Sequence, residues 1–122
     1  MPRSRVVLYR EENGSVPFME WFGGLPAHAK DKVLVRIERL RELGHELRRP
    51  EADFLRDGIY ELRATTRGVH YRVLYFFYGR VATVVAHGVI KESDVPERDI
   101  KIAIRRRTLF EANPAEHTFE ES

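Results

Sequence analysis

The chain has 122 residues, which fits a single domain, and its 43% hydrophobic and 33% charged residues indicate a folded protein rather than a disordered one. It contains no cysteine, which excludes disulfides, thiolate catalysis and cysteine-based zinc sites. No apolar run approaches the ~20 residues that a membrane-spanning helix needs. The basic start of the chain leads into too short an apolar stretch for a secretory signal, so we expect a cytoplasmic protein.

Charge is distributed unevenly along the chain. The formal net charge is only +2, but residues 108–122 hold four glutamates and no lysine or arginine. Without these four acids the body of the chain carries +6. A basic body suits a polyanion such as nucleic acid, although ordinary solubilising charge explains the same excess.

The first part of the chain predicts one strand and two helices. Residues 6–9 form a short apolar strand. We expect a short helix over residues 16–22, capped by Ser15. A longer helix follows Pro26, because apolar residues recur at helical spacing, and it ends at Gly44, a residue typical of helix ends.

One side of this longer helix is basic. It carries Lys30, Lys32, Arg36, Arg39 and Arg41. We interpret this row as a solvated helix face, which is the more common origin of such a pattern.

The middle of the chain predicts a meander of three antiparallel strands. Residues 59–65, 69–78 and 81–88 are rich in β-branched and aromatic residues and are separated by glycine-containing turns. The second of these strands is apolar on both faces towards its end, so we expect it to lie centrally in the sheet.

A last helix begins near Pro96, where Ser93 or Asp94 can serve as its cap. We expect Arg105–Arg107 in its last turn, where cations suit the helix dipole. Asn113 and the proline that follows it end any helix.

The order of elements predicts an α+β fold. Two N-terminal helices and a C-terminal helix are expected to pack on one side of a small twisted antiparallel sheet. The domain is expected to span residues 1–110, and the acidic residues 111–122 are expected to form a flexible tail.

No motif for a nucleotide, a dinucleotide or a catalytic metal is present in the sequence. There is no P-loop, no glycine-rich dinucleotide turn and no His-Glu-x-x-His, and the carboxylates do not cluster in a ligand pattern. We therefore expect neither a metal nor a cofactor.

Cationic side chains lie on and beside the predicted strands instead. They are Arg63, Arg67, His70, Arg72, His87 and Lys91. Arg72 interrupts an apolar strand, where an unpaired buried charge is costly. It either pairs with Glu61 or opens onto a functional cleft.

Such a set could cleave RNA without a metal. The 2′-hydroxyl attacks the adjacent phosphate, guanidinium groups stabilise the developing charge, and imidazole can transfer protons near neutral pH. Tyr71, Tyr75 or Tyr78 could stack on a base or supply a phenol. A lone strand histidine is more often structural, and that alternative stays open for His70 and His87.

Several segments stand out in combination. They are Asp57-Gly58-Ile59-Tyr60-Glu61-Leu62-Arg63, Tyr71-Arg72-Val73-Leu74-Tyr75-Phe76, His87-Gly88-Val89-Ile90-Lys91, the early Val16-Pro17-Phe18-Met19-Glu20-Trp21-Phe22, and the last helix with Ile100, Ala103 and Arg105. Together they resemble the phage-derived, HigB-like branch of the RelE toxin superfamily over about residues 6–110.

The resemblance implies a RelE-like fold and a type II toxin. Such toxins cut mRNA in the ribosomal A site and are neutralised by an antitoxin with a helix-turn-helix domain. Operator DNA would then be bound only through the antitoxin complex. By position, Arg63 and Arg72 match the basic sheet residues, Lys91 the basic residue after the last strand, and His87 the histidine before the glycine.

Two departures from the family pattern concern the proton-transfer groups. Ile90 stands where an aromatic residue is frequent, and Glu92 stands where a second lysine is frequent. Residues 108–110 contain no tyrosine, although relatives often place one in or near the last helix.

The predicted catalytic set is Arg63, Tyr71, Arg72, His87 and Lys91. Further RNA contacts are predicted for Arg67, His70, Arg105 and Arg106. The alternatives are a non-catalytic toxin of the same fold that inhibits a protein target such as DNA gyrase, and an inactive relative.

Overall fold

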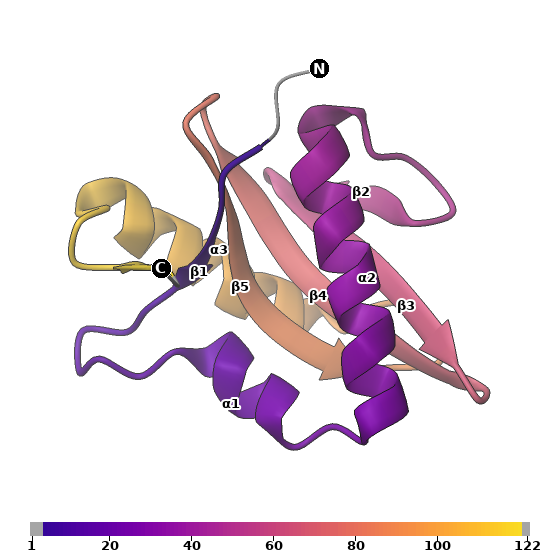
Figure 1. The fold of residues 1–122 in the computed structure, drawn as a ribbon. Helices are drawn as coiled ribbons and strands as arrows, with labels where there is room; N and C mark the ends of the chain where they lie inside the picture. The colour runs from indigo at the N-terminus through magenta and orange to yellow at the C-terminus, as the bar shows by residue number, and fades with distance from the viewer. Residues whose placement is uncertain (1–3, 121–122) are drawn as a thin grey trace.

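The computed structural model describes residues 4–120, and its fold is α+β, as the sequence predicts (Figure 1). The strands are β1 (Val6–Tyr9), β2 (Ala52–Arg56), β3 (Ile59–Thr66), β4 (Val69–Tyr78), β5 (Ala82–Ile90) and β6 (Thr118–Phe119). The helices are α1 (Pro17–Gly23), α2 (Ala27–Leu43) and α3 (Glu97–Ala112), and a 3₁₀ turn, η1 (Gly44–Glu46), follows α2. The predicted helices and the central meander are therefore confirmed.

The strands form one six-stranded sheet in the order β2-β3-β4-β5-β1-β6. Strands β2 to β5 are antiparallel neighbours, whereas β1 runs parallel to β5, with Val7 opposite Val84. The expectation of a purely antiparallel sheet is wrong at this point. Helices α1 and α2 and strands β2 to β4 lie between β1 and β5 in the chain, and this is the long connection that a parallel pair requires.

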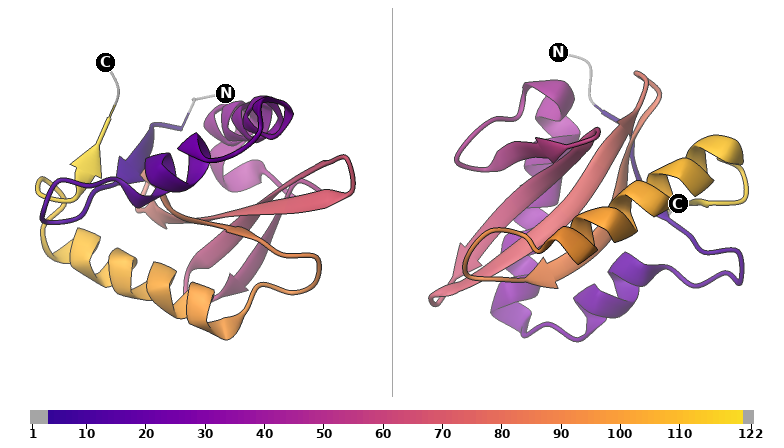
Figure 2. Two further views of the ribbon diagram at one scale, coloured as in Figure 1. Left: turned by 90° about the horizontal axis from the view of Figure 1, so that it is seen from below. Right: turned by 180° about the vertical axis from the view of Figure 1, so that it is seen from behind.

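Helices cover both faces of the sheet (Figures 1 and 2). Helices α1 and α2 pack on the face that carries Leu62, Val73 and Tyr75, and α3 packs on the face that carries Leu74 and Phe76. The expected one-sided packing is wrong because β4 is apolar on both faces, and each face has to be removed from water.

The side-chain caps expected for two helices are not the ones that form. The cap positions of α1 and α3 are Val16 and Pro96, and neither makes a side-chain cap hydrogen bond. Ser15 therefore does not cap α1, and neither Ser93 nor Asp94 caps α3. A proline with its fixed φ prepares the chain for each helix instead.

Part of the segment expected to be a flexible tail takes regular structure. Helix α3 extends to Ala112, so Arg105–Arg107 lie before its last turn and not within it. Further on, Thr118 pairs with Tyr9 of β1. His117 is buried and its ring stacks on that of Tyr9, with the centroids 5.2 Å apart.

The turn between β3 and β4 sets the register of the site described below. Its central residues, Arg67 and Gly68, both have positive φ, at 51° and 77°. Such a two-residue turn matches the twist of the strands that it joins. It places Thr65 directly opposite His70 and Arg63 directly opposite Arg72.

Gly88 allows α1 to lie close to β5. A Cβ atom at this position would lie 2.2 Å from ring atoms of Trp21, which α1 places against the sheet. No side chain larger than hydrogen fits under this rigid ring, so the glycine in the His87-Gly88 segment has a packing role.

We expect Gly88→Ala to lower the free energy of unfolding by about 1–3 kcal/mol, because the added methyl group forces the indole ring and α1 away from the sheet. Urea and thermal denaturation measure this change. Gly23→Ala is the matched control, since a Cβ there meets no atom within 4 Å. Equal stability of the two variants would contradict the packing of Trp21 on Gly88.

Candidate functional site

Charged side chains occupy one end of the sheet face on which α3 packs. Alternation along β3 places Glu61 and Arg63 on the same face as Ile59, and alternation along β4 places Arg72 on the same face as Leu74. Ile59 and Leu74 belong to the apolar cluster packed with α3, whereas the charged residues lie beyond it. The face is thus divided into an apolar part and a polar part.

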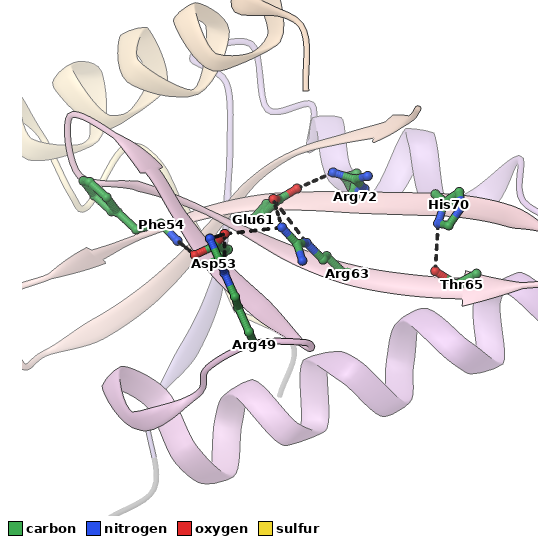
Figure 3. Close-up of polar contacts among 8 residues, drawn as sticks. All are labelled: Arg49, Asp53, Phe54, Glu61, Arg63, Thr65, His70 and Arg72. Atoms are coloured by element: carbon green, nitrogen blue, oxygen red, sulfur yellow. Dashed lines mark hydrogen bonds and ion pairs between the residues drawn. The ribbon is translucent and has the colours of Figure 1, made fainter. Parts of the chain in front are cut away.

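Glu61 is the centre of this polar part (Figure 3). Glu61 is only 3% exposed, and its carboxylate accepts hydrogen bonds from Arg72 Nη1 at 2.6 Å and from Arg63 Nη2 at 2.9 Å. Arg63 also contacts Asp53 of β2 at 3.3 Å, and Asp53 is paired in turn with Arg49. The sequence left open whether Arg72 pairs with Glu61 or opens onto a cleft, and the structure shows the pair.

Arg72 nevertheless also borders a cavity of about 360 Å³. The cavity is lined by Lys32, Arg36, Pro50, Arg63, Thr65, His70 and Arg72, and we call it the basic pocket. Four of its lining residues are lysine or arginine and none is acidic. Only Nη1 of Arg72 is used in a hydrogen bond within residues 4–120, so the rest of its guanidinium remains free to bind an anion.

Helix α2 contributes two of the cations, and the sequence patterns did not single them out. Strand β2 ends its pairing at Ala52 opposite Leu62, which leaves the rest of the β3 edge without a neighbouring strand. Arg36 reaches this edge and donates from Nε to the carbonyl oxygen of Arg63 at 2.9 Å. Lys32 lies one helical turn earlier and makes no hydrogen bond or ion pair among the described residues.

The row that we interpreted as a solvated helix face is therefore partly a wall of the basic pocket. The i, i+4 spacing of Lys32 and Arg36 is the signal that places both side chains on one side of α2. Glu51, in the segment before β2, binds Arg36 at 3.2 Å and Arg39 at 3.0 Å and holds this wall in place.

His70 lies near the start of β4, and Lys91 follows the end of β5 beside it. The Nδ1 atom of His70 is 3.0 Å from the hydroxyl oxygen of Thr65. Lys91 is exposed, and its backbone N–H donates to the carbonyl oxygen of His70 at 3.1 Å. Arg67, two residues after Thr65, is exposed in the turn between β3 and β4. Of the predicted residues, the structure brings Arg63, His70 and Arg72 into the pocket and Lys91 beside it.

His87 lies elsewhere, between the sheet and α3. Its Nε2 atom is 2.7 Å from Oδ1 of the buried Asp99, and its Nδ1 atom is 3.1 Å from Nη1 of Arg106. A guanidinium only donates, so Nδ1 accepts and Nε2 carries the proton toward Asp99. Burial lowers the pKa of His87, in keeping with a neutral ring. Both ring nitrogens are occupied, which leaves none for a substrate.

Arg106 is also engaged within the protein. It donates to the carbonyl oxygen of Ala86 at 2.7 Å as well as to His87, and its guanidinium lies over the ring of Tyr9. Burial lowers the pKa of Arg106. Arg105, its neighbour on α3, is exposed. Of the two helix arginines predicted to bind RNA, only Arg105 presents its side chain to solvent.

Tyr71 points to the opposite face of the sheet from Arg72. It is 3% exposed and packs edge-on against Trp21, with the ring centroids 6.5 Å apart. Tyr75 is buried on the same face as Tyr71, and Tyr78 packs against Phe110. None of the three phenols lines the basic pocket.

A comparison with protein families places the chain among known proteins. The model of the family described as "Phage derived protein Gp49-like (DUF891)" matches residues 20–108, from α1 into α3, and includes all residues of the basic pocket. The chain belongs to this family. The Gp49-like family is related to the RelE-like toxins of toxin–antitoxin systems, which confirms the coarse part of the resemblance. A search of curated proteins found no match for this Gp49-like chain.

Two general properties complete the description of this Gp49-like protein. Among residues 4–120, no helix is long and apolar enough to cross a membrane. The same residues contain no group of three or more acidic or histidine side chains placed to hold a metal ion.

The buried His87 makes a testable contribution to the pH dependence of stability. In the unfolded chain a histidine titrates near pH 6.5. The folded protein holds the pKa of His87 below this value. As the pH falls past about 6.5, the unfolded chain therefore binds more protons than the folded protein does. The free energy of unfolding therefore decreases as the pH falls from about 7 to about 5.

We expect His87→Gln, whose amide can still donate to Asp99 but does not titrate, to lose less stability over this pH range than the wild type. Urea denaturation of both proteins at each pH measures the difference. Parallel losses would show that His87 is not held neutral in the folded protein.

Proposed function

We propose that this Gp49-like protein is a toxin that cuts messenger RNA at the basic pocket, without a metal or a cofactor, and that it acts in the cytoplasm. The observation that carries the proposal is the pocket itself. Lys32, Arg36, Arg63 and Arg72 surround a space of about 360 Å³ without an acidic lining residue, and His70 lies at its edge. A phosphodiester is the anion that such a pocket suits, and guanidinium groups bind its oxygens well.

Arg63, Arg72 and His70 have separate roles in the proposed cleavage of RNA. Arg63 and Arg72 stabilise the charge that develops on the phosphate as the 2′-oxygen attacks the phosphorus. His70 accepts the proton of the 2′-hydroxyl at Nε2, and the leaving 5′-oxygen takes a proton from water. The protonated His70 then gives its proton to the hydroxide that is left. The products are a 2′,3′-cyclic phosphate and a 5′-hydroxyl end.

This assignment transfers the proton-transfer role from His87 and Tyr71 to His70. His87 has no free ring nitrogen, and Tyr71 lies on the other face of the sheet. Lys91 and Arg67 remain as exposed cations that bind the RNA on either side of the pocket, in keeping with their positions beside His70 and in the adjoining turn.

The relation of the family to toxin–antitoxin systems supports an antitoxin as a partner, and the other partners are part of the proposal. A cognate antitoxin with a helix-turn-helix domain neutralises the toxin, and operator DNA is bound only through that antitoxin. The target is mRNA in the ribosomal A site, where the RNA backbone is presented to a small basic protein. The excess of cations in the basic pocket also suits an acidic segment of the antitoxin.

Mapping of transcript 5′ ends after brief induction in cells tests the proposal. We expect new 5′-hydroxyl ends within coding regions. His70→Ala should reduce them by about a hundredfold, because it removes the general base. Lys32→Ala should reduce them by about tenfold, because it removes one charge-assisted phosphate contact.

Lys101→Ala is the matched control, because it removes an exposed lysine on α3 and should leave cleavage unchanged. Growth arrest without new 5′ ends would contradict RNA cleavage and support the alternative of a toxin that inhibits a protein target such as DNA gyrase. Full cleavage by both pocket variants would contradict the assignment of the pocket.

A further inference from the structure

Thr65 and His70 form a cross-strand pair (Figure 3). They are directly opposite each other in the β3–β4 register, which brings Thr65 Oγ1 within 3.0 Å of His70 Nδ1. Both residues line the pocket. The hydroxyl therefore holds one ring nitrogen of the histidine that the substrate would meet.

The other ring nitrogen of His70 is available. Among the described residues, His70 Nε2 makes no hydrogen bond or ion pair. The hydrogen bond from the Lys91 N–H to the His70 carbonyl fixes the backbone at this position. The ring is thus held on one side and open on the other, unlike that of His87, which is held on both sides.

Apart from Pro50 and Thr65, the other residues that line the pocket with His70 are cationic. They are Lys32 and Arg36 on α2, Arg63 on β3 and Arg72 on β4, and no carboxylate lines the space. Among the residues that line the pocket with His70, Thr65 is therefore the only one whose side chain can accept a hydrogen bond from the ring.

We propose that Thr65 is the positioning residue for His70, an inference that rests on the proposed function. When Nδ1–H donates to the Thr65 hydroxyl, the lone pair of the neutral ring lies on Nε2, the ring nitrogen that has no partner among the described residues. The same hydrogen bond persists after Nε2 takes the substrate proton, so the ring does not have to turn during the reaction. The partner is neutral and does not trap the charged ring, as a carboxylate would.

The chain supplies a set of matched variants for a test. Thr65→Val removes the hydroxyl but keeps the β-branched shape that suits a strand, and Thr65→Ser keeps the hydroxyl. Thr66→Val is the control, because the Thr66 hydroxyl lies 3.4 Å from Nδ1 of His28, outside the pocket. The cleavage of mRNA on ribosomes is measured in single turnover, as the rate constant at saturating toxin and the half-saturating toxin concentration.

We expect Thr65→Val to lower the saturating rate constant by about tenfold, a part of the full contribution of a general base. The half-saturating concentration should stay within about twofold of the wild-type value, since every cation of the pocket is retained. Thr65→Ser should restore the rate, and Thr66→Val should leave it unchanged. An unchanged rate in Thr65→Val, a change in the half-saturating concentration alone, or no recovery with serine would overturn the proposal.

A second measurement separates this inference from the proposed function. Absence of cleavage by the wild type would contradict the function, whereas the contact itself is tested by the ¹⁵N chemical shifts of the histidine rings in the free protein. We expect Thr65→Val to change the shifts of His70 and Thr66→Val to change only those of His28. Identical His70 shifts in the wild type and Thr65→Val would show that the hydroxyl does not position the ring.

Discussion

One buried carboxylate, Glu61, determines the character of the charged end of the sheet. An ion that is 3% exposed is costly unless it is paired and hydrogen-bonded, and Glu61 meets this requirement with two arginines. Asp53 is a second acid beside Arg63, and Arg49, which pairs with Asp53, is a third arginine, so three arginines face two acids and a net positive charge remains. The interaction that makes Arg63 and Arg72 compatible with the sheet therefore also makes this end attractive to an anion.

The division of one sheet face explains why the site lies where it does. Helix α3 covers the part of this face that carries Leu74 and Phe76, and the network of His87, Asp99 and Arg106 lies between α3 and the sheet. The charged part lies beyond this cover and borders the basic pocket. Helix α2 contributes both to the core and to the pocket. Its apolar side packs on the other face of the sheet, while Lys32 and Arg36 reach the open edge of β3.

Much of this arrangement could be predicted because it depends on local patterns. Residues that are close in the sequence determine three of its features: the apolar periodicity of α2, the turns with positive φ, and a strand β4 that is apolar on both faces. Alternation alone also predicts that Tyr71 and Arg72 point to opposite faces, and it could have removed Tyr71 from the catalytic set. Strand β2 was not foreseen because its pairing is irregular at Phe54 and its side chains are partly exposed.

The rest depends on contacts between distant segments, which a local pattern does not contain. Lys32 and Arg36 join the pocket because the pairing of β2 with β3 ends at Leu62 and leaves the rest of the β3 edge without a neighbouring strand. Both ring nitrogens of His87 are hydrogen-bonded, one to Asp99 and one to Arg106, which lie 12 and 19 residues further along the chain. A sequence motif identified His87 as a candidate, but only the packing of α3 on β5 shows that it is engaged.

The most direct test of the central claim is the structure of the protein bound to an oligoribonucleotide whose 2′-hydroxyl at the scissile position is methylated, so that it cannot be cut. The account predicts a phosphate in the basic pocket, within hydrogen-bond distance of Arg72 and Arg63, with the methylated 2′-oxygen facing His70 Nε2. An RNA that bound along α3 and left the basic pocket empty would contradict it.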